Sequence, residues 1–364
     1  MYIRHFGISL LAAAALLPLA GACTKVENVQ VESRTGLSYN VALEQPRTKA
    51  ATAYSTSETF KSYAWYLPDG KTWASDKADA VPYFADATIS FDTGSSVWRD
   101  ASNHYYWPKA GSLSFRSYSP ASIPATGTTS TGGISVTKDG ITLTNWELNE
   151  TTHQDIDFMV ADLTSDRTAN STTYGYLGVP TLFRHKLAKL TIQASCGTVP
   201  TTGQEPKIYK ISLRHIFTQA TYTGSDDSWG SRTATNTTSL DEIVLFNESA
   251  GQTITEIAKV FSGTSGLLVI PQVLNTYTAT TDSRTVAASI YVEYAYYDTA
   301  IGGYPSTPSS AEKTFDGIAS YLWVIGHHYT YNLVIGEENE PIEFDASVAD
   351  WTDGGSYTIN IGGE

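Results

Sequence analysis

The sequence predicts an all-β protein built from β-sandwiches, with about two domains in its 364 residues. Short apolar or alternating runs recur along the chain, at 37–43, 112–118, 134–143, 189–194, 242–246, 266–270, 289–297 and 329–336. Turn signals such as Asp69-Gly70 and Asp139-Gly140 separate these runs, and helical periodicity is scarce. The composition agrees, because tyrosine is frequent (23 residues) and charged residues make up only 16% of the chain.

The N-terminus predicts export from the cytoplasm. Arg4 precedes the apolar stretch FGISLLAAAALLPLA at 6–20, which ends in small residues. This is the pattern of a secretory signal peptide, and it is too short to span a bilayer, which takes about 20 apolar residues. We therefore expect residues 1–22 to be removed as a signal peptide.

Cys23 is one of two cysteines and follows that stretch after Gly21 and Ala22, in LAGAC. This segment resembles the lipobox of a bacterial lipoprotein signal, which implies acylation of Cys23 with chains such as palmitate. Two or more chains give stable anchoring where a single chain gives only marginal binding. The alternative is an ordinary signal peptide with a chance cysteine nearby. The lipobox interpretation predicts a lipoprotein precursor in the outer membrane.

No motif in the chain predicts catalysis, a cofactor or a metal. The net charge of −14 argues against a nucleic-acid partner, which needs a basic face. The GKT of PDGKTW (68–73) lacks the glycine of a phosphate loop, because Trp65 stands in its place. His327 and His328 point to opposite faces of a strand, and the aspartates of HQDIDFMVAD (153–162) lack the spacing of a calcium loop. We therefore expect a protein that is not an enzyme.

Clusters of aromatic residues leave a binding role open. Trp65, Tyr66 and Trp73 flank one predicted turn, and HYYW at 104–107 is dense in rings. Rings on strands can stack on sugars, so a glycan-binding surface lipoprotein is one alternative function. Packing in the core and across strands is the simpler interpretation, since aromatic pairs are favoured there.

The most polar interval, 163–178, marks the expected boundary between two domains. We place the first sandwich up to the end of this interval, at 48–178, and the second sandwich after it, at 179–364.

Several segments follow one another in an order that carries a family resemblance. WRDASNHYYWPKAGSLSFRSYSP (98–120) contains a YWP step, an apolar strand and a Y-x-P ending. It is followed by DFMVAD (157–162), LFRHKLAKLTI (182–192), LLVIPQ (267–272), a W-x-x-G-x-x-Y-x-Y-x-L-x-I pattern (323–335) and IEFDASVADWTDGG (342–355). These motifs, in this order over most of residues 37–364, resemble the fimbrillin family of Bacteroidales, the subunits of their protease-assembled pili.

The resemblance implies two tandem transthyretin-like Greek-key β-sandwich domains, exported as a lipoprotein, as in the Mfa-like and FimA-like type V pilus subunits. In the family an arginine-specific protease removes the first strand, and a strand of another subunit fills the vacated groove. The implied partners are other fimbrial subunits, in a homo- or hetero-polymer, that protease, the outer membrane through the lipid, and a host or bacterial surface receptor. The implied location is a cell-surface fimbrium that supports adhesion. A tip adhesin and a lipid-anchored cap of the same pilus are alternatives.

The chain offers a matching pair of strand types for such an exchange. In LSYNVALE (37–44) the apolar residues alternate with polar or small ones and fall on one face. The expected first strand therefore presents Leu37, Tyr39, Val41 and Leu43. The C-terminal segments alternate in the same way, and the expected donor residues are Ile342, Phe344, Ala346, Val348, Tyr357, Ile359 and Ile361.

Arg47 is the expected processing site. It lies in QPRTKAATAYSTSE (45–58), where Pro46 blocks continued strand pairing and the following Thr/Ala/Ser run is expected to be exposed. Cleavage after Arg47 releases a propeptide, 23–47, that carries both the lipid and the first strand. Arg34 is the competing site, but cleavage there keeps the first strand, so Arg47 is preferred. If neither bond is cut, the protein stays in the membrane as an anchor or cap.

Overall fold

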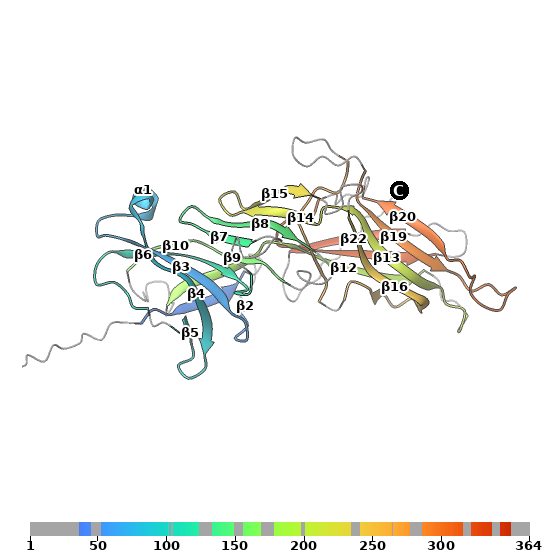
Figure 1. Cartoon of the computed structure of the whole chain (residues 1–364). Coiled ribbons are helices and arrows are strands. Elements are labelled where there is room, and N and C mark those ends of the chain that lie inside the picture. The colour runs from blue at the N-terminus through green and yellow to red at the C-terminus, as the bar shows by residue number, and fades with distance from the viewer. Residues whose placement is uncertain are drawn as a thin grey trace, which may run out of the picture. The chain divides into compact units, whose positions relative to one another are not determined.

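Strands make up almost all of the regular structure (Figure 1), which confirms the all-β prediction. The computed structural model describes residues 36–44, 52–100, 102, 105–123, 133–148, 156–168, 178–197, 201–233, 241–263, 265–276, 286–315, 322–336 and 343–350. Helical structure in this part of the chain is confined to α1 (Trp73–Asp76) and the 3-10 turn η1 (Lys77–Asp79). Both lie in the connection between two paired strands, β3 (Phe60–Leu67) and β4 (Val81–Asp92).

The first sheet closes on itself. Its remaining strands are β1 (Tyr39–Leu43), β2 (Thr52–Ala53), β5 (Val97–Asp100), β6 (Ser112–Ser119), β9 (Met159–Ala161), β10 (Thr164–Arg167) and β11 (Val179–His185). The strand order is β10-β6-β3-β4-β5-β1-β11-β9, with β2 attached to β1, and β9 also pairs with β6. The strands from β6 round to β9 therefore form a closed ring. Closure removes the free edges that an open sheet offers to other chains.

The interior of this ring is an aromatic core. Its buried rings come from six strands of the ring, from the residue after β2 and from the approach to β6: Tyr39, Tyr54, Phe60, Phe84, Trp98, Trp107, Phe115 and Phe183. Most contacts are edge-to-face, as between Phe60 and Phe183, whose ring centroids lie 5.2 Å apart. Such pairs stabilise beyond the burial of their area. Part of the aromatic content of the sequence is thus packed inside the protein.

Two further sheets carry the second core. One contains β12 (Ala188–Cys196), β17 (Lys259–Val260), β18 (Leu267–Val269), β21 (His327–Ile335) and β22 (Glu343–Asp350), in the order β17-β12-β21-β22 with β18 paired to β12. The other contains β13 (Lys207–Ile216), β16 (Asp241–Thr253), β19 (Ser289–Ala295) and β20 (Ser309–Thr314), in the order β16-β13-β19-β20. Their alternating apolar residues, such as Leu190, Ile192, Ile211 and Leu333, are fully buried in one cluster.

A fourth sheet joins segments that are far apart in the sequence. It pairs the hairpin β7 (Gly133–Val136) and β8 (Ile141–Glu147) with the hairpin β14 (Gln219–Thr223) and β15 (Ser228–Thr233), in the order β15-β14-β8-β7 (Figure 1). Strand pairing thus crosses the expected boundary at residue 178 here, and again where β11 pairs with β1. The division into two Greek-key domains stays a prediction.

The two turn signals in the sequence have different outcomes. Asp139-Gly140 forms the turn between β7 and β8, where the Thr137 amide donates to the carbonyl oxygen of Gly140 at 2.9 Å. Asp69-Gly70 also forms a turn, with Gly70 at a φ of 80°. This turn leads into α1 rather than directly back into a strand. The carboxylate of Asp69 accepts a hydrogen bond from the Gly111 amide at 2.6 Å, so this turn is fixed by a distant loop.

Candidate functional site

The expected first strand, β1, is one of the strands that form the closed ring. Its burial alternates as the sequence pattern predicts: Tyr39 and Val41 are buried, and Asn40 and Ala42 are partly exposed. Leu37, just before the strand, is also buried, and the half-buried Leu43 packs against the same aromatic core. We call the space that β1 occupies between β11 and β5 the β1 slot.

Tyr39 is the central side chain of the β1 slot and is only 3% exposed. Its ring meets Phe60 and Phe115 edge-on, with centroids 5.5 and 6.1 Å away. Its hydroxyl donates a hydrogen bond of 3.0 Å to the hydroxyl oxygen of Ser62, which also accepts one of 3.0 Å from Ser117. Burial raises the pKa of Tyr39, so the side chain stays neutral. Ser62 is therefore a polar point beside the aromatic core, and Tyr39 of β1 hydrogen-bonds to it.

The two sides of β1 are held very differently. On one side it runs parallel to β11 in continuous register, from Tyr39 opposite Val179 to Leu43 opposite Phe183. The Val179 amide extends this ladder by donating to the carbonyl oxygen of Ser38 at 2.7 Å. On the other side, β5 meets β1 only at Tyr39, and β2 meets it only at Ala42 and Leu43. The ladder with β11 is thus the main backbone attachment of β1.

A cavity of about 230 Å³ adjoins the beginning of β1. Residues 36–39 form one wall, and residues of β4, β5 and the loop that carries Tyr105 and Tyr106 form the others. The Leu37 amide donates to the carbonyl oxygen of Tyr105 at 2.8 Å, so the strand is tied across the cavity. The β1 slot is thus bordered by a cavity at this end.

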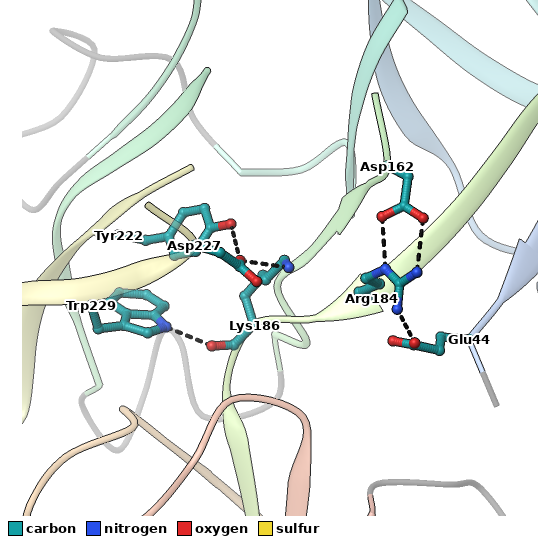
Figure 2. Close-up of polar contacts among 7 residues, drawn as sticks. All are labelled: Glu44, Asp162, Arg184, Lys186, Tyr222, Asp227 and Trp229. Atoms are coloured by element: carbon teal, nitrogen blue, oxygen red, sulfur yellow. Dashed lines mark hydrogen bonds and ion pairs between the residues drawn. The ribbon is translucent and has the colours of Figure 1, made fainter. Parts of the chain in front are cut away.

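Arg184 on β11 holds the other end of β1 (Figure 2). Its guanidinium forms two parallel hydrogen bonds to Asp162, of 2.7 and 2.9 Å, and a third contact to Glu44. Glu44 directly follows β1, and Asp162 directly follows β9. One cation therefore links three neighbouring strands, with the bidentate geometry that arginine forms with carboxylates.

Lys186 fixes the segment that follows β11, as Figure 2 also shows. Its side chain is only 5% exposed, and its ammonium lies 2.7 Å from a carboxylate oxygen of Asp227. The Tyr222 hydroxyl donates to the same oxygen at 2.7 Å, and the Trp229 indole donates to the Lys186 carbonyl oxygen at 2.5 Å. Burial opposes ionisation of Asp227, but these hydrogen bonds lower its pKa overall. The wall of the β1 slot is thus anchored to the β14–β15 hairpin.

β22, the last strand that the structure describes, has a different position. It pairs with β21 over eight residues and lies at one end of its sheet. Ala346 and Ser347 are buried, and the half-buried Val348 packs against the second core. Phe344 lies in the strand, opposite Leu333 in the register. The segment expected as a donor is therefore paired within its own subunit in this structure.

The other expected site residues lie outside the described residues. These are Cys23, Arg34, Arg47, Ile342, Tyr357, Ile359 and Ile361. Sequence reasoning missed Arg184 and Lys186, although both stand in the LFRHKLAKL segment. The segment carried no signal that set these two residues apart, because it contains four basic residues and charged side chains are usually solvated.

The aromatic residues and histidines considered as candidate sites in the sequence pack or form hydrogen bonds within the protein. Trp65 and Trp73 are buried and lie 6.0 Å apart between ring centroids, and Trp107 is buried in the aromatic core. His327 and His328 contact different partners, the Ile325 carbonyl oxygen and the Thr191 hydroxyl. Among the residues that the structure describes, no cluster of His, Cys, Asp or Glu could hold a metal ion. Within the same residues, no helix has the length and apolar character needed to cross a membrane.

Comparisons with known proteins give one consistent family. Residues 42–351 match the family described as fimbrillin-like. A solved fimbrial protein from Bacteroides vulgatus superposes with a TM-score of 0.59 at 18% identity, covering 87% of this chain and 99% of that chain. A candidate cell adhesion protein from Bacteroides uniformis superposes with a TM-score of 0.52 at 19% identity, covering 88% and 99%. At these identities the structural likeness shows a shared fold. No curated protein matches the chain.

Proposed function

Because the chain belongs to the fimbrillin-like family, we propose that it is a structural subunit of a cell-surface fimbria that assembles by exchanging β1 for a strand of another subunit. The precursor is exported as an outer-membrane lipoprotein through Cys23. An arginine-specific protease then cuts after Arg47, and the subunits polymerise into a fimbria that supports adhesion. The protein acts by assembly and adhesion and not as an enzyme.

One observation carries this proposal: β1 is an interior member of a closed ring, held mainly by its ladder with β11. Losing it exposes the edge of β11 together with an apolar slot. Three buried side chains, Leu37, Tyr39 and Val41, contribute roughly 5–9 kcal/mol of gross burial at about 1.5–3 kcal/mol each. An unpaired edge beside an apolar slot is a template for strand addition from another chain.

The position of Arg47 supports its role as the processing site. It falls between the end of β1 at Leu43 and the start of β2 at Thr52. A cut there detaches β1 and leaves every other described strand in the body of the protein. A cut after Arg34 leaves β1 in its slot, so the lipid would be lost without opening the ring.

The partners follow from the same proposal. Other fimbrial subunits supply and receive strands, the arginine-specific protease matures the precursor, and the lipid on Cys23 holds the precursor in the outer membrane. A receptor on a host or bacterial surface would complete an adhesive role.

Matched protease-site variants test the proposal. The precursor is treated with an arginine-specific protease, and its products are examined by gel electrophoresis and N-terminal sequencing. We expect the wild type and Arg34→Lys to start at Thr48 and to form ladders. We expect Arg47→Lys to stay monomeric, because β1 remains attached. Polymerisation of Arg47→Lys to the wild-type extent would overturn strand exchange, and a lipid-bound, uncut product would make the protein an anchor or cap.

A further inference from the structure

We propose that the cavity beside the beginning of β1 binds a single neutral sugar residue, such as the end of a surface glycan. This binding does not depend on strand exchange, because the cavity is complete in the uncut chain. Three features of the cavity favour such a ligand: its size, its mixture of apolar and hydrogen-bonding groups, and the charges that face it.

The cavity is large enough for one sugar ring. Its volume is about 230 Å³. At about 30 Å³ for each water molecule, this is room for about seven waters, close to what one sugar ring with its hydroxyl groups needs. Tyr106 and the side chain of Arg99 line the cavity and are both more than a third exposed, so it opens at the surface. A glycan chain could therefore continue outward from a bound terminal sugar.

Much of the lining is aliphatic or aromatic. The residues that supply this surface are Leu37, Ile89, Val97, Tyr105 and Tyr106. The C–H groups on one face of a sugar ring can pack against it, with a few polar groups left to fix the orientation. Core packing explains only part of the HYYW segment, because Trp107 belongs to the aromatic core whereas Tyr105 and Tyr106 border the cavity.

Two charged residues of the lining favour a neutral ligand. Asp100 is only 7% exposed, and its carboxylate accepts a hydrogen bond from the Ser102 amide at 2.8 Å. A carboxylate offers about four lone-pair sites, so it can accept further donors. The guanidinium of Arg99 forms an ion pair with Asp92. An anion would face the Asp100 carboxylate and a cation would face Arg99, whereas sugar hydroxyls can donate to the first and accept from the second.

The aromatic wall of the cavity is held in place by the protein itself. The ring of Tyr105 stacks on Phe84, with centroids 4.3 Å apart. The carbonyl oxygen of Tyr106 accepts a hydrogen bond of 2.6 Å from the Tyr83 hydroxyl. Burial raises the pKa of Tyr105, so its hydroxyl keeps its proton and can donate. Walls that are already ordered lower the entropy cost of binding.

The wall formed by residues 36–39 links this site to the presence of β1. A ligand that binds only when β1 is in place stabilises that form of the protein by mass action. A subunit that keeps β1, such as an uncut anchor or cap, would therefore keep the whole site.

Titration of the uncut, full-length precursor tests the proposal, by calorimetry and by ligand-observed NMR. The probes are the methyl glycosides of glucose, galactose, mannose and N-acetylglucosamine. We expect at least one of them to bind with a stoichiometry of one. The uronic acid and the amino sugar of the same configuration should bind roughly tenfold more weakly, because each brings a charge close to a like charge. Binding by none of the four glycosides, or tighter binding by a charged form, overturns the proposal.

Three variants place the bound sugar. Asp100→Asn should weaken binding by roughly tenfold or more, because a hydrogen bond to a charged acceptor is stronger than one to a neutral acceptor. Tyr106→Ala should also weaken it, and this partly exposed residue can be truncated with little risk to folding. The matched control is Asp86→Asn, an exposed position on β4 outside the lining, which should bind as the wild type does. Unchanged affinity in both cavity variants, with folding checked by urea unfolding, would place the sugar elsewhere and overturn the proposal.

Discussion

Strands β1 and β22 have the same alternating sequence pattern, but their positions in the protein differ. β1 is one strand of a closed ring, with β11 on one side and β5 and β2 on the other. β22 lies at the end of its sheet, and β21 is its one partner among the described strands. Removing β1 opens a slot with two sides, whereas removing β22 shortens a sheet by one strand. Under the proposed strand exchange, position in the sheet, and not the pattern itself, therefore marks the strand whose loss prepares the protein for assembly.

Truncating one core residue in each strand should give the largest difference. Tyr39→Ala in the uncut precursor should lower the free energy of unfolding by about 3–5 kcal/mol, because it leaves a cavity in the aromatic core. Val348→Ala in β22 should cost less than half of that, since this side chain is smaller and only partly buried. Urea unfolding of both precursors measures the difference. Equal losses would show that the two strands are held equally.

Removing either partner of the ion pair between Lys186 and Asp227 should change the stability of the protein by different amounts. Asp227→Ala leaves the buried Lys186 ammonium without its carboxylate and should cost about 2–3 kcal/mol, less than a fully buried pair because the Asp227 side chain is 57% exposed. Lys186→Met removes the buried charge itself and should be close to neutral. Thermal unfolding of the two variants checks the order. A larger loss for Lys186→Met would show that the ion pair itself stabilises the wall.

A substitution at Gly178 tests how closely the backbone of β1 approaches β11. Its φ is +112°, and a Cβ there would lie 2.7 Å from the carbonyl oxygen of Ser38. Gly178→Ala should therefore destabilise the precursor by about 2 kcal/mol through strain and a backbone clash. Gly203 is a matched control, with a φ of +87° and no atom within 4 Å of its Cβ position, so Gly203→Ala should cost about 1 kcal/mol. Identical unfolding midpoints for the two variants would show that the close approach of β1 adds no cost at Gly178.

The contact between Glu44 and Arg184 should have the smallest effect. Both side chains are partly exposed, so Glu44→Gln should lower stability by less than about 1 kcal/mol, and 1 M salt should abolish the difference. Arg184→Gln should cost more, because it also loses two hydrogen bonds to Asp162. Urea unfolding at low and high salt separates the two variants. A salt-independent loss in Glu44→Gln would mean that Glu44 acts through packing.

The sequence allowed the strands to be predicted better than their partners. The runs at 37–43, 112–118 and 189–194 correspond closely to β1, β6 and β12, because alternation is a local property of the chain. The closure of the ring between β6 and β9 could not be predicted, since it joins residues about 40 positions apart through pairing alone. The sheet shared by β8 and β14 escaped prediction for the same reason.

Side-chain contacts in the candidate site could not be predicted from the sequence for the same reason. The buried face of β1 follows from its pattern, but the hydrogen bond from Tyr39 to Ser62 depends on two strands meeting in one register. Lys186 stands in a segment that contains four basic residues, where a charge is usually solvated. Only the fold brings Asp227 to it, from a turn 41 residues further along the chain.

The N-terminal residue of the subunit in the assembled, extracellular polymer tests the central claim most directly. We predict Thr48, which means that the lipid on Cys23 and the whole of β1 have been left behind. A polymer whose subunits begin at Cys23 or Thr35 would still contain β1 in its slot, and assembly by exchange of this strand would be contradicted.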